Sequence, residues 1–105
     1  MENNRDDYMM VTVRVKQKLS EAYKINMIRS GKTITDDLIS HIRKQVDDYH
    51  VPDYKLEIDD NNYIKINFRI ERELYTNYKV QMVLNRTTPT ADITRHMLKT
   101  VESDL

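Results

Sequence analysis

Two short stretches decide the fold of this chain: Val11-Thr12-Val13-Arg14-Val15 and, 55 residues later, Ile66-Asn67-Phe68-Arg69-Ile70. In each stretch, apolar residues alternate strictly with polar ones. A period of two with β-branched or aromatic residues on one face is typical of a β-strand that is buried on one side. The sequence therefore predicts a strand in each stretch, with the polar side chains facing away from the core.

The similarity extends beyond the strands. Shifting residues 11–46 by 55 positions places them on 66–101 without a gap, and 11 of the 36 aligned pairs are identical. Apolar residues at helical spacing then predict a first helix in each copy, from Lys18 to Arg29 and from Glu73 to Leu84. Self-similarity at a fixed offset indicates two copies of one supersecondary unit.

The start of a second helix is marked in both copies. Thr88 followed by Pro89 is typical of a helix N-cap with proline at the first helical position, and Thr33 has the same place in the first copy. Gly31 suits the end of the preceding helix, whereas the second copy has Asn85-Arg86 there. Each unit is therefore strand–helix–helix.

Neither unit can satisfy its strand alone, because a single strand leaves its backbone groups unpaired. We expect a mainly α fold with a two-stranded antiparallel β-ribbon, built from two fused strand–helix–helix repeats with pseudo-two-fold symmetry. The expected parts form one compact unit and are a flexible tail (1–8), repeat 1 (9–46), an acidic linker (47–62) and repeat 2 (63–105).

The charge is distributed unevenly. The whole chain of 105 residues is neutral, but residues 9–46 carry +5, residues 63–105 carry +2, and the linker carries −5. Zero cysteines exclude disulfides and thiol catalysis, and the single glycine excludes a glycine-rich phosphate loop. We therefore expect no enzyme, no catalytic residue and no cofactor. With no apolar run long enough to cross a bilayer and no signal-peptide pattern, we expect a cytoplasmic protein that does not use a membrane.

This arrangement resembles the ribbon-helix-helix family, the MetJ/Arc-like repressors. The likeness lies in Ile66-Asn67-Phe68-Arg69-Ile70 and in Ser30-Gly31-Lys32-Thr33-Ile34-Thr35, and it covers about three quarters of the chain. Members of that family usually dimerise to complete the fold, so this sequence looks like two protomers fused into a tandem pseudodimer. The resemblance implies a sequence-specific regulator of transcription whose paired strands enter the major groove of double-stranded DNA. Of the two directions of regulation, it favours repression.

The resemblance also implies which side chains touch DNA. Arg can grip guanine, Asn can bridge adenine, and Thr can contact a thymine methyl, whereas helix N-termini with hydroxyl groups can hold phosphates. The expected base contacts are Met10, Thr12, Arg14, Lys65, Asn67 and Arg69. The expected phosphate contacts are Lys16, Lys32, Thr33, Thr35, Thr88 and Thr90. The alternatives are that the strand residues are merely solvated and that the threonines only cap their helices.

The two copies differ at matched positions. Lys16 corresponds to Glu71, Met10 to Lys65, and Thr12 to Asn67. A single chain can present two different strands, whereas a homodimer cannot. We therefore expect an operator that is an imperfect palindrome or has asymmetric half-sites.

His41 and His96 each follow an acid by four residues, Asp37 and Asp92. A metal site would use this spacing, because residues four apart share a helix face. The resemblance favours structural pairing within a cluster of Lys32, Asp37 and His41 instead, and we expect no metal.

A second apolar stripe recurs on the first helices, at Ile25 and Ile28 and at Val80 and Val83. Either residues 54–58 of the linker fold back as a hairpin strand and cover it, or a second chain on an adjacent site does, and chain–chain contact is the favoured interpretation. A protein-interaction module of the same fold, antitoxin-like or antirepressor-like with weak or no DNA binding, is the alternative function. In that case residues 1–8 or 47–62 would contact the partner.

Overall fold

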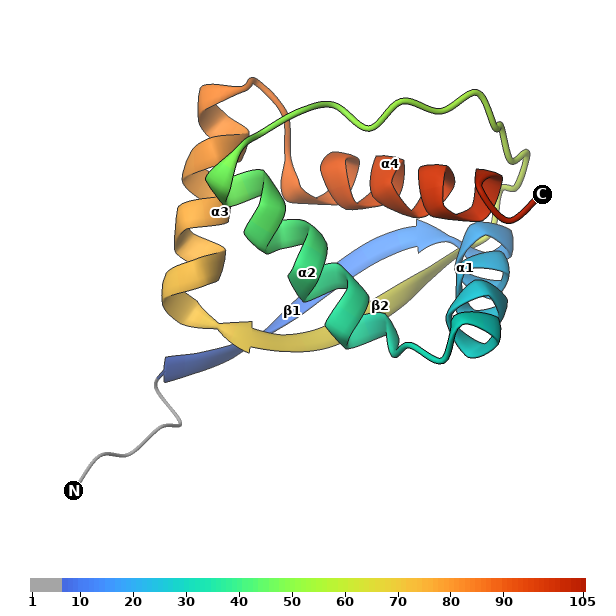
Figure 1. The fold of residues 1–105 in the computed structure, drawn as a ribbon, viewed down its shortest axis with the longest axis horizontal. Coiled ribbons are helices and arrows are strands. Elements are labelled where there is room, and N and C mark those ends of the chain that lie inside the picture. The colour runs from blue at the N-terminus through green and yellow to red at the C-terminus, as the bar shows by residue number, and fades with distance from the viewer. Residues whose placement is uncertain (1–6) are drawn as a thin grey trace.

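The computed structural model describes residues 7–105 and contains six elements (Figure 1). Their order is β1 (Tyr8–Lys16), α1 (Gln17–Ser30), α2 (Ile34–Asp47), β2 (Tyr63–Glu71), α3 (Arg72–Leu84) and α4 (Pro89–Glu102). The predicted mainly helical class with a two-stranded antiparallel sheet is confirmed. The strand begins at Tyr8, inside the segment predicted as a tail, and residues 1–6 lie outside the described part. None of the helices in 7–105 has the length and apolar character that a bilayer span requires.

The two strands form an antiparallel ribbon in which each pairs with the other along its whole length. Val11 lies opposite Phe68, Thr12 opposite Asn67, and Val13 opposite Ile66. The apolar members of these pairs are buried, and the polar members are exposed. All four helices therefore cover one face of the ribbon and leave the other face to solvent (Figure 1).

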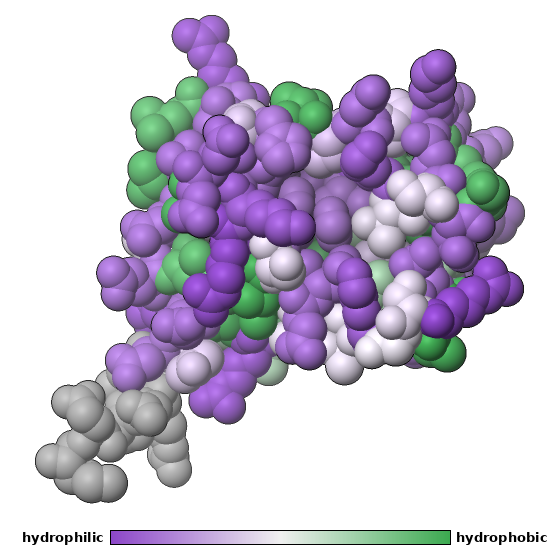
Figure 2. Space-filling model, in the orientation of Figure 1, coloured by the Kyte–Doolittle hydropathy of each residue, from purple (hydrophilic) through white to green (hydrophobic). Residues whose placement is uncertain are grey.

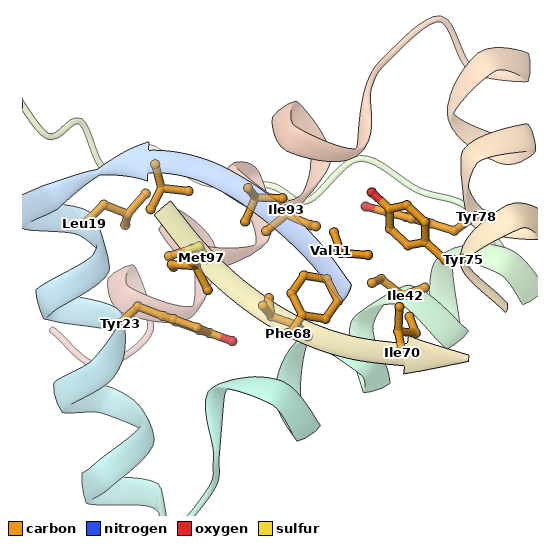
Figure 3. Close-up of a cluster of buried hydrophobic side chains, with 14 of the residues drawn as sticks. Val11, Leu19, Tyr23, Ile42, Phe68, Ile70, Tyr75, Tyr78, Ile93 and Met97 are labelled. Atoms are coloured by element: carbon orange, nitrogen blue, oxygen red, sulfur yellow. The ribbon is translucent and has the colours of Figure 1, made fainter. Parts of the chain in front are cut away.

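The core lies between the ribbon and the helices, and every element contributes to it (Figure 3). Tyr23 of α1 and Tyr78 of α3 are completely buried, as the helical periodicity predicted. Helix α1 packs on α4, and α2 packs on α3. Because burial of one large apolar side chain contributes about 1.5–3 kcal/mol, these contacts make the two halves of the chain mutually dependent.

The predicted helix caps are present. The Thr33 hydroxyl accepts a hydrogen bond from the backbone N–H of Asp36, and the Thr88 hydroxyl accepts one from Ala91, both at 3.1 Å. Gly31 ends α1 in the left-handed region with φ of 68°. Arg86 has a positive φ of 56° at the corresponding turn after α3.

The linker contains no strand, so the hairpin considered for residues 54–58 is not formed. Instead the linker crosses over α4 towards the start of α1 (Figure 1). The Glu102 carboxylate accepts hydrogen bonds from the backbone N–H groups of Lys55 and Leu56, at 2.7 and 2.8 Å. Leu56 and Ile58 also pack against the core, so hydrogen bonds and apolar contacts together hold this segment in place.

The linker ends by capping α1. Lys16, at the N-cap of α1, makes no side-chain cap, and the Asp60 carboxylate takes that role by accepting from the backbone N–H of Lys18 at 2.9 Å. Hydrogen bonds from the Lys18 and Asn62 backbone lower the pKa of Asp60. A carboxylate at this end of a helix also interacts favourably with the helix dipole.

Candidate nucleic-acid interface

The outer face of the ribbon gathers the residues that were expected to contact bases. All six are exposed, and because side chains alternate along a strand, all six lie on the same side of the sheet. They are Met10, Thr12, Arg14, Lys65, Asn67 and Arg69. Across the ribbon, Met10 lies opposite Arg69, and Arg14 lies opposite Lys65. Apart from Met10, the face is therefore a polar and basic strip two strands wide.

The centre of this strip is a pair of side chains that bind each other. Thr12 donates its hydroxyl hydrogen to Oδ1 of Asn67 at 2.6 Å. The amide N–H groups of Asn67 remain available as donors, and the oxygen of the Thr12 hydroxyl remains available as an acceptor. The pair fixes the rotamers of both side chains, which reduces the entropy that a ligand would have to remove.

Each arginine of the strip lies over an aromatic ring. The Arg14 guanidinium is 4.8 Å from the centre of the Tyr63 ring, and that of Arg69 is 4.8 Å from the Tyr8 ring. Cation–π contacts at exposed sites contribute about 0.5–1 kcal/mol, and here they hold both guanidinium groups against the ribbon. Sequence reasoning missed the two tyrosines, although they share the 55-residue offset and the outward strand positions.

The ends of the strip are different from each other. The Lys16 ammonium donates to the Ile58 carbonyl of the linker at 3.0 Å, so this expected phosphate contact is partly engaged. At the matched position, Glu71 accepts from Arg43 of α2 at 3.1 Å. That ion pair balances the one acidic side chain on β2, which would otherwise repel an anion.

The expected phosphate contacts at the second helices lie at exposed or half-buried N-termini. Thr33 and Thr88 are exposed, and both hydroxyls already cap their helices. Thr35 is half-buried and Thr90 is exposed. Lys32 is mostly exposed, and its ammonium lies 3.8 Å from Asp37, a loose ion pair.

Of the four threonines expected to contact phosphates, Thr90 is the one that shares a cleft with the end of β1. Together with Arg14 and Lys16 it lines a cleft of about 820 Å³ between β1, α4 and the linker. The linker contributes Glu57 and Asp59 to the same cleft. This end of the strip therefore carries both charges, because the acidic linker runs beside it.

The two histidines pair across the halves, which corrects the prediction that each would pair on its own helix. His41 contacts Asp92 at 2.8 Å, and His96 contacts Asp37 at 2.8 Å. The two imidazole rings stack with centres 4.1 Å apart. The chain thus keeps the expected structural pairing but exchanges the partners.

Buried hydroxyl groups complete these pairs. Tyr23 donates to Asp37 at 2.5 Å, and Tyr78 donates to Asp92 at 2.6 Å. Burial alone would raise the pKa of Asp37, but hydrogen bonds from His96 and Tyr23 outweigh it and lower that pKa to about 2. Burial lowers the pKa of His41, and the neighbouring His96 adds to that effect, while the bond to Asp92 opposes it. The acids are therefore anionic over the whole neutral range.

Within residues 7–105, no cluster of three or more His, Cys, Asp or Glu side chains is placed to hold a metal ion.

No protein-family model matches the chain, and searches of the curated proteins and of the solved structures found no match.

Proposed function

We propose that this chain is a sequence-specific double-stranded DNA-binding regulator of transcription, acting as a repressor. In this proposal it is a single-chain ribbon-helix-helix pseudodimer that inserts its β-ribbon into the major groove. One observation carries the proposal: Arg14 and Arg69 lie at equal 4.8 Å separations over Tyr63 and Tyr8, on either side of the exposed Thr12–Asn67 pair. A major groove about 12 Å wide admits a two-stranded ribbon with such side chains.

The chemistry of the strip suits base edges. Arginine donates two parallel hydrogen bonds to O6 and N7 of guanine, each good pair being worth about 1–3 kcal/mol of discrimination. The free amide donors of Asn67 suit acceptors such as adenine N7. Met10, which is 61% exposed, offers an apolar surface to a thymine methyl.

The register supports the pseudodimer. Thr12 and Asn67 occupy matched repeat positions and face each other, so an approximate two-fold axis would pass between them. The two ends of the ribbon nevertheless differ. The acidic linker flanks the end near Arg14, whereas Glu71 and Arg43 form an ion pair at the end near Arg69. We propose an operator with asymmetric half-sites, in which contacts near Arg69 are stronger than those near Arg14.

Selection of bound sequences from a random double-stranded DNA pool, followed by gel-shift titration, tests the function. Arg14→Ala and Arg69→Ala should each weaken binding to the selected sequence by about tenfold to a hundredfold. The matched control is Lys24→Ala, which removes a positive charge from the exposed surface of α1. Selection of no sequence, or unchanged affinity in both arginine variants, would overturn the proposal.

Salt dependence provides a second readout. Binding through phosphates releases counterions, so the affinity should fall steeply and linearly in a double-logarithmic plot against salt concentration.

Thr33→Val and Thr88→Val should weaken binding to all sequences alike, whereas the arginine variants should change the preferred sequence.

A protein-interaction module is the second candidate, favoured by exposed apolar residues on the outer faces of α1 and α3. Ile28 and Val83 are 73% and 75% exposed, and Ile25 and Val80 are about half exposed. In the DNA-binding function these stripes support contacts between chains on adjacent sites, whereas in the second function they contact a different protein. A chain that associates with a protein partner and gives no gel shift with any selected DNA would favour this second function over the first.

A further inference from the structure

Each tyrosine at an end of the ribbon contacts the arginine of the other repeat. The ring of Tyr63, the first residue of β2, lies under the guanidinium of Arg14 on β1. The ring of Tyr8, the first residue of β1, lies under the guanidinium of Arg69 on β2. Both tyrosines are exposed. The same contact is therefore made twice, once at each end of the ribbon, and each time it joins the two halves of the chain.

The antiparallel register explains this crossing. Tyr63 lies opposite Lys16, two residues along β1 from Arg14. Outward side chains at such diagonal positions are within reach of each other when one of them is aromatic or long. Tyr8 and Arg69 have the same diagonal relation at the other end of the ribbon. Each arginine thus depends for its position on a ring from the half of the chain to which it does not belong.

The ring is the one partner that restrains each of these guanidinium groups within residues 7–105. The side chains of Arg14 and Arg69 form no hydrogen bond and no ion pair there. Arg43 of α2, in contrast, is held by the carboxylate of Glu71. An arginine without restraint has to give up rotamer freedom when it binds a ligand, and this loss lowers affinity. The tyrosine rings reduce the loss because they keep each guanidinium near one position.

The strand ends that carry the tyrosines are themselves fixed by the first helix of the opposite half. Gln17, the first residue of α1, donates its backbone N–H to the carbonyl of Asn62, next to Tyr63, at 2.9 Å. Arg72, the first residue of α3, donates from its guanidinium to the backbone carbonyl of Tyr8 at 3.3 Å. Both rings therefore project from backbone that is held in place.

Hydrophilic character alone does not distinguish the strip from the rest of the surface. Figure 2 views the molecule from the side on which α2 and α4 lie in front, and hydrophilic residues predominate there as well. What distinguishes the strip is that both of its arginines lie over aromatic rings. The rings are therefore the feature of the strip that needs a functional explanation.

We propose that Tyr8 and Tyr63 are positioning residues for base recognition, each of which directs the arginine of the other repeat to guanine. This role rests on the proposed DNA binding. The paired hydrogen bonds of arginine to O6 and N7 of guanine need a defined orientation of the guanidinium plane, whereas a mobile arginine can also reach phosphate oxygens. Loss of one ring therefore lowers the sequence discrimination by the arginine on the opposite strand, and neither half-site is read by one repeat alone.

Selection from a random double-stranded DNA pool, followed by gel-shift titration, tests this role in variants of the full chain. Tyr63→Leu should relax the same base preference that Arg14→Ala relaxes, and should weaken binding of the selected sequence by about twofold to tenfold. It should leave the preference that depends on Arg69 unchanged. Tyr8→Leu should give the converse result. Tyr63→Phe and Tyr8→Phe keep the ring and should keep both preferences.

Double variants separate positioning from direct contact of a tyrosine with DNA. In the Arg14→Ala background, Tyr63→Leu should weaken binding little further, because the ring then has no arginine to direct. In the Arg69→Ala background, Tyr63→Leu should weaken binding by its full factor. A full effect in both backgrounds would show that the ring acts on DNA without the arginine, and would overturn the proposal.

The free chain gives a readout that needs no DNA. Nitrogen-15 relaxation of the Nε–H group of Arg14 should report larger motion in Tyr63→Leu than in the natural chain, with the Nε–H group of Arg69 as the internal control. Unchanged motion of Arg14 in this variant would overturn the proposal. Thermal unfolding of each variant checks that the fold is retained.

The failure of this role and the failure of the proposed function give different results. Selection of no sequence by the natural chain would overturn both. Selection of a sequence that depends on Arg14 and Arg69, with unchanged preferences in Tyr63→Leu and Tyr8→Leu, would overturn the role of the tyrosines alone.

Discussion

At Gly31 and at Arg86 the chain leaves a helix through the same left-handed turn. Glycine adopts this conformation without strain, whereas arginine does not. The turn closes with the same hydrogen bonds in both places: Lys32 N–H donates to the Met27 carbonyl, and Thr87 N–H donates to the Met82 carbonyl, each at 2.9 Å. A left-handed conformation costs a residue with a Cβ about 1–2 kcal/mol, a cost that glycine avoids. The second half therefore folds with a strain that the first half lacks.

Arg86→Gly should raise the free energy of unfolding by about 0.5–1 kcal/mol, because the turn is kept and the strain is removed. Gly31→Ala should lower it by about 1 kcal/mol, since no atom lies within 4 Å of a Cβ built there and only the conformational cost applies. Urea unfolding measures both. Equal stability of Arg86→Gly and the natural chain would contradict the strain at Arg86.

His41 gives the fold a pH dependence near neutrality. Its pKa is lowered from the ordinary value of 6.5 by burial, so below that value the unfolded chain takes up a proton that the folded chain resists. Stability should therefore fall as the pH drops below about 6.5, and fall again below about 4 as Asp37, with its pKa lowered to about 2, becomes protonated only when unfolded.

Urea unfolding between pH 7.5 and pH 5 measures the first of these two losses. His41→Gln should remove most of the slope in that range, because glutamine does not titrate. His50→Gln, a change at an exposed histidine of the linker, is the control and should keep the slope. A slope that is unchanged in His41→Gln would assign the effect to another group.

At the scale of elements, the linker stabilises the start of α1 in addition to joining the two halves of the chain. Its last residues supply the carboxylate that caps α1, and its middle is anchored on α4 by Glu102. Glu71, at the N-cap of α3, makes no side-chain cap of its own. Helix α1 begins where the linker ends, so the linker can supply the cap that Lys16 does not.

Asp60→Asn should destabilise the fold and loosen the linker, because the cap on Lys18 loses its negative charge. Asp59→Asn, at the exposed neighbouring position, removes the same charge without removing a cap and should have little effect. Hydrogen exchange of the first amides of α1, together with thermal unfolding, measures the difference. Equal effects of both variants would show that only net charge matters.

Much of this element structure could be predicted from the sequence. Alternation located both strands, Thr33 and Thr88 located the starts of the second helices, and the spacing of the apolar residues placed Tyr23 and Tyr78 in the core. The path of the linker could not be predicted, because it depends on hydrogen bonds between backbone groups and Glu102, which leave no periodic pattern. The expected base-contact residues were placed together by strand alternation alone, whereas Tyr8 and Tyr63 escaped notice because a ring beside an arginine is a tertiary contact.

At the scale of the whole molecule, contacts between the halves outweigh those within them. α1 packs on α4, α2 packs on α3, and each buried acid is bonded to a histidine of the opposite half. The sequence could not reveal this exchange, because the spacing of four residues within a helix fits Asp37 with His41 and carries no information about a pair on two different helices such as Asp37 with His96. Only the crossing of α2 and α4 decides between them.

Double-mutant cycles can measure this exchange. His41→Ala combined with Asp92→Ala should give a coupling energy of about 1–3 kcal/mol, because removal of one partner leaves the other buried and unpaired. His41→Ala combined with Asp37→Ala should give a smaller coupling, since these side chains are not bonded directly. A larger coupling for the second pair would contradict the crossed arrangement.

The crossed bonds also bear on how such chains can change over generations. Because Asp92 is bonded to His41, we expect a substitution at Asp92 to be compensated at position 41, more than fifty residues away, and not at position 96 one helical turn further on. Descendants of this gene should therefore show correlated changes between positions 37 and 96 and between 41 and 92. The two halves of the chain would then change together at these four positions, while the exposed residues of the two strands would change independently.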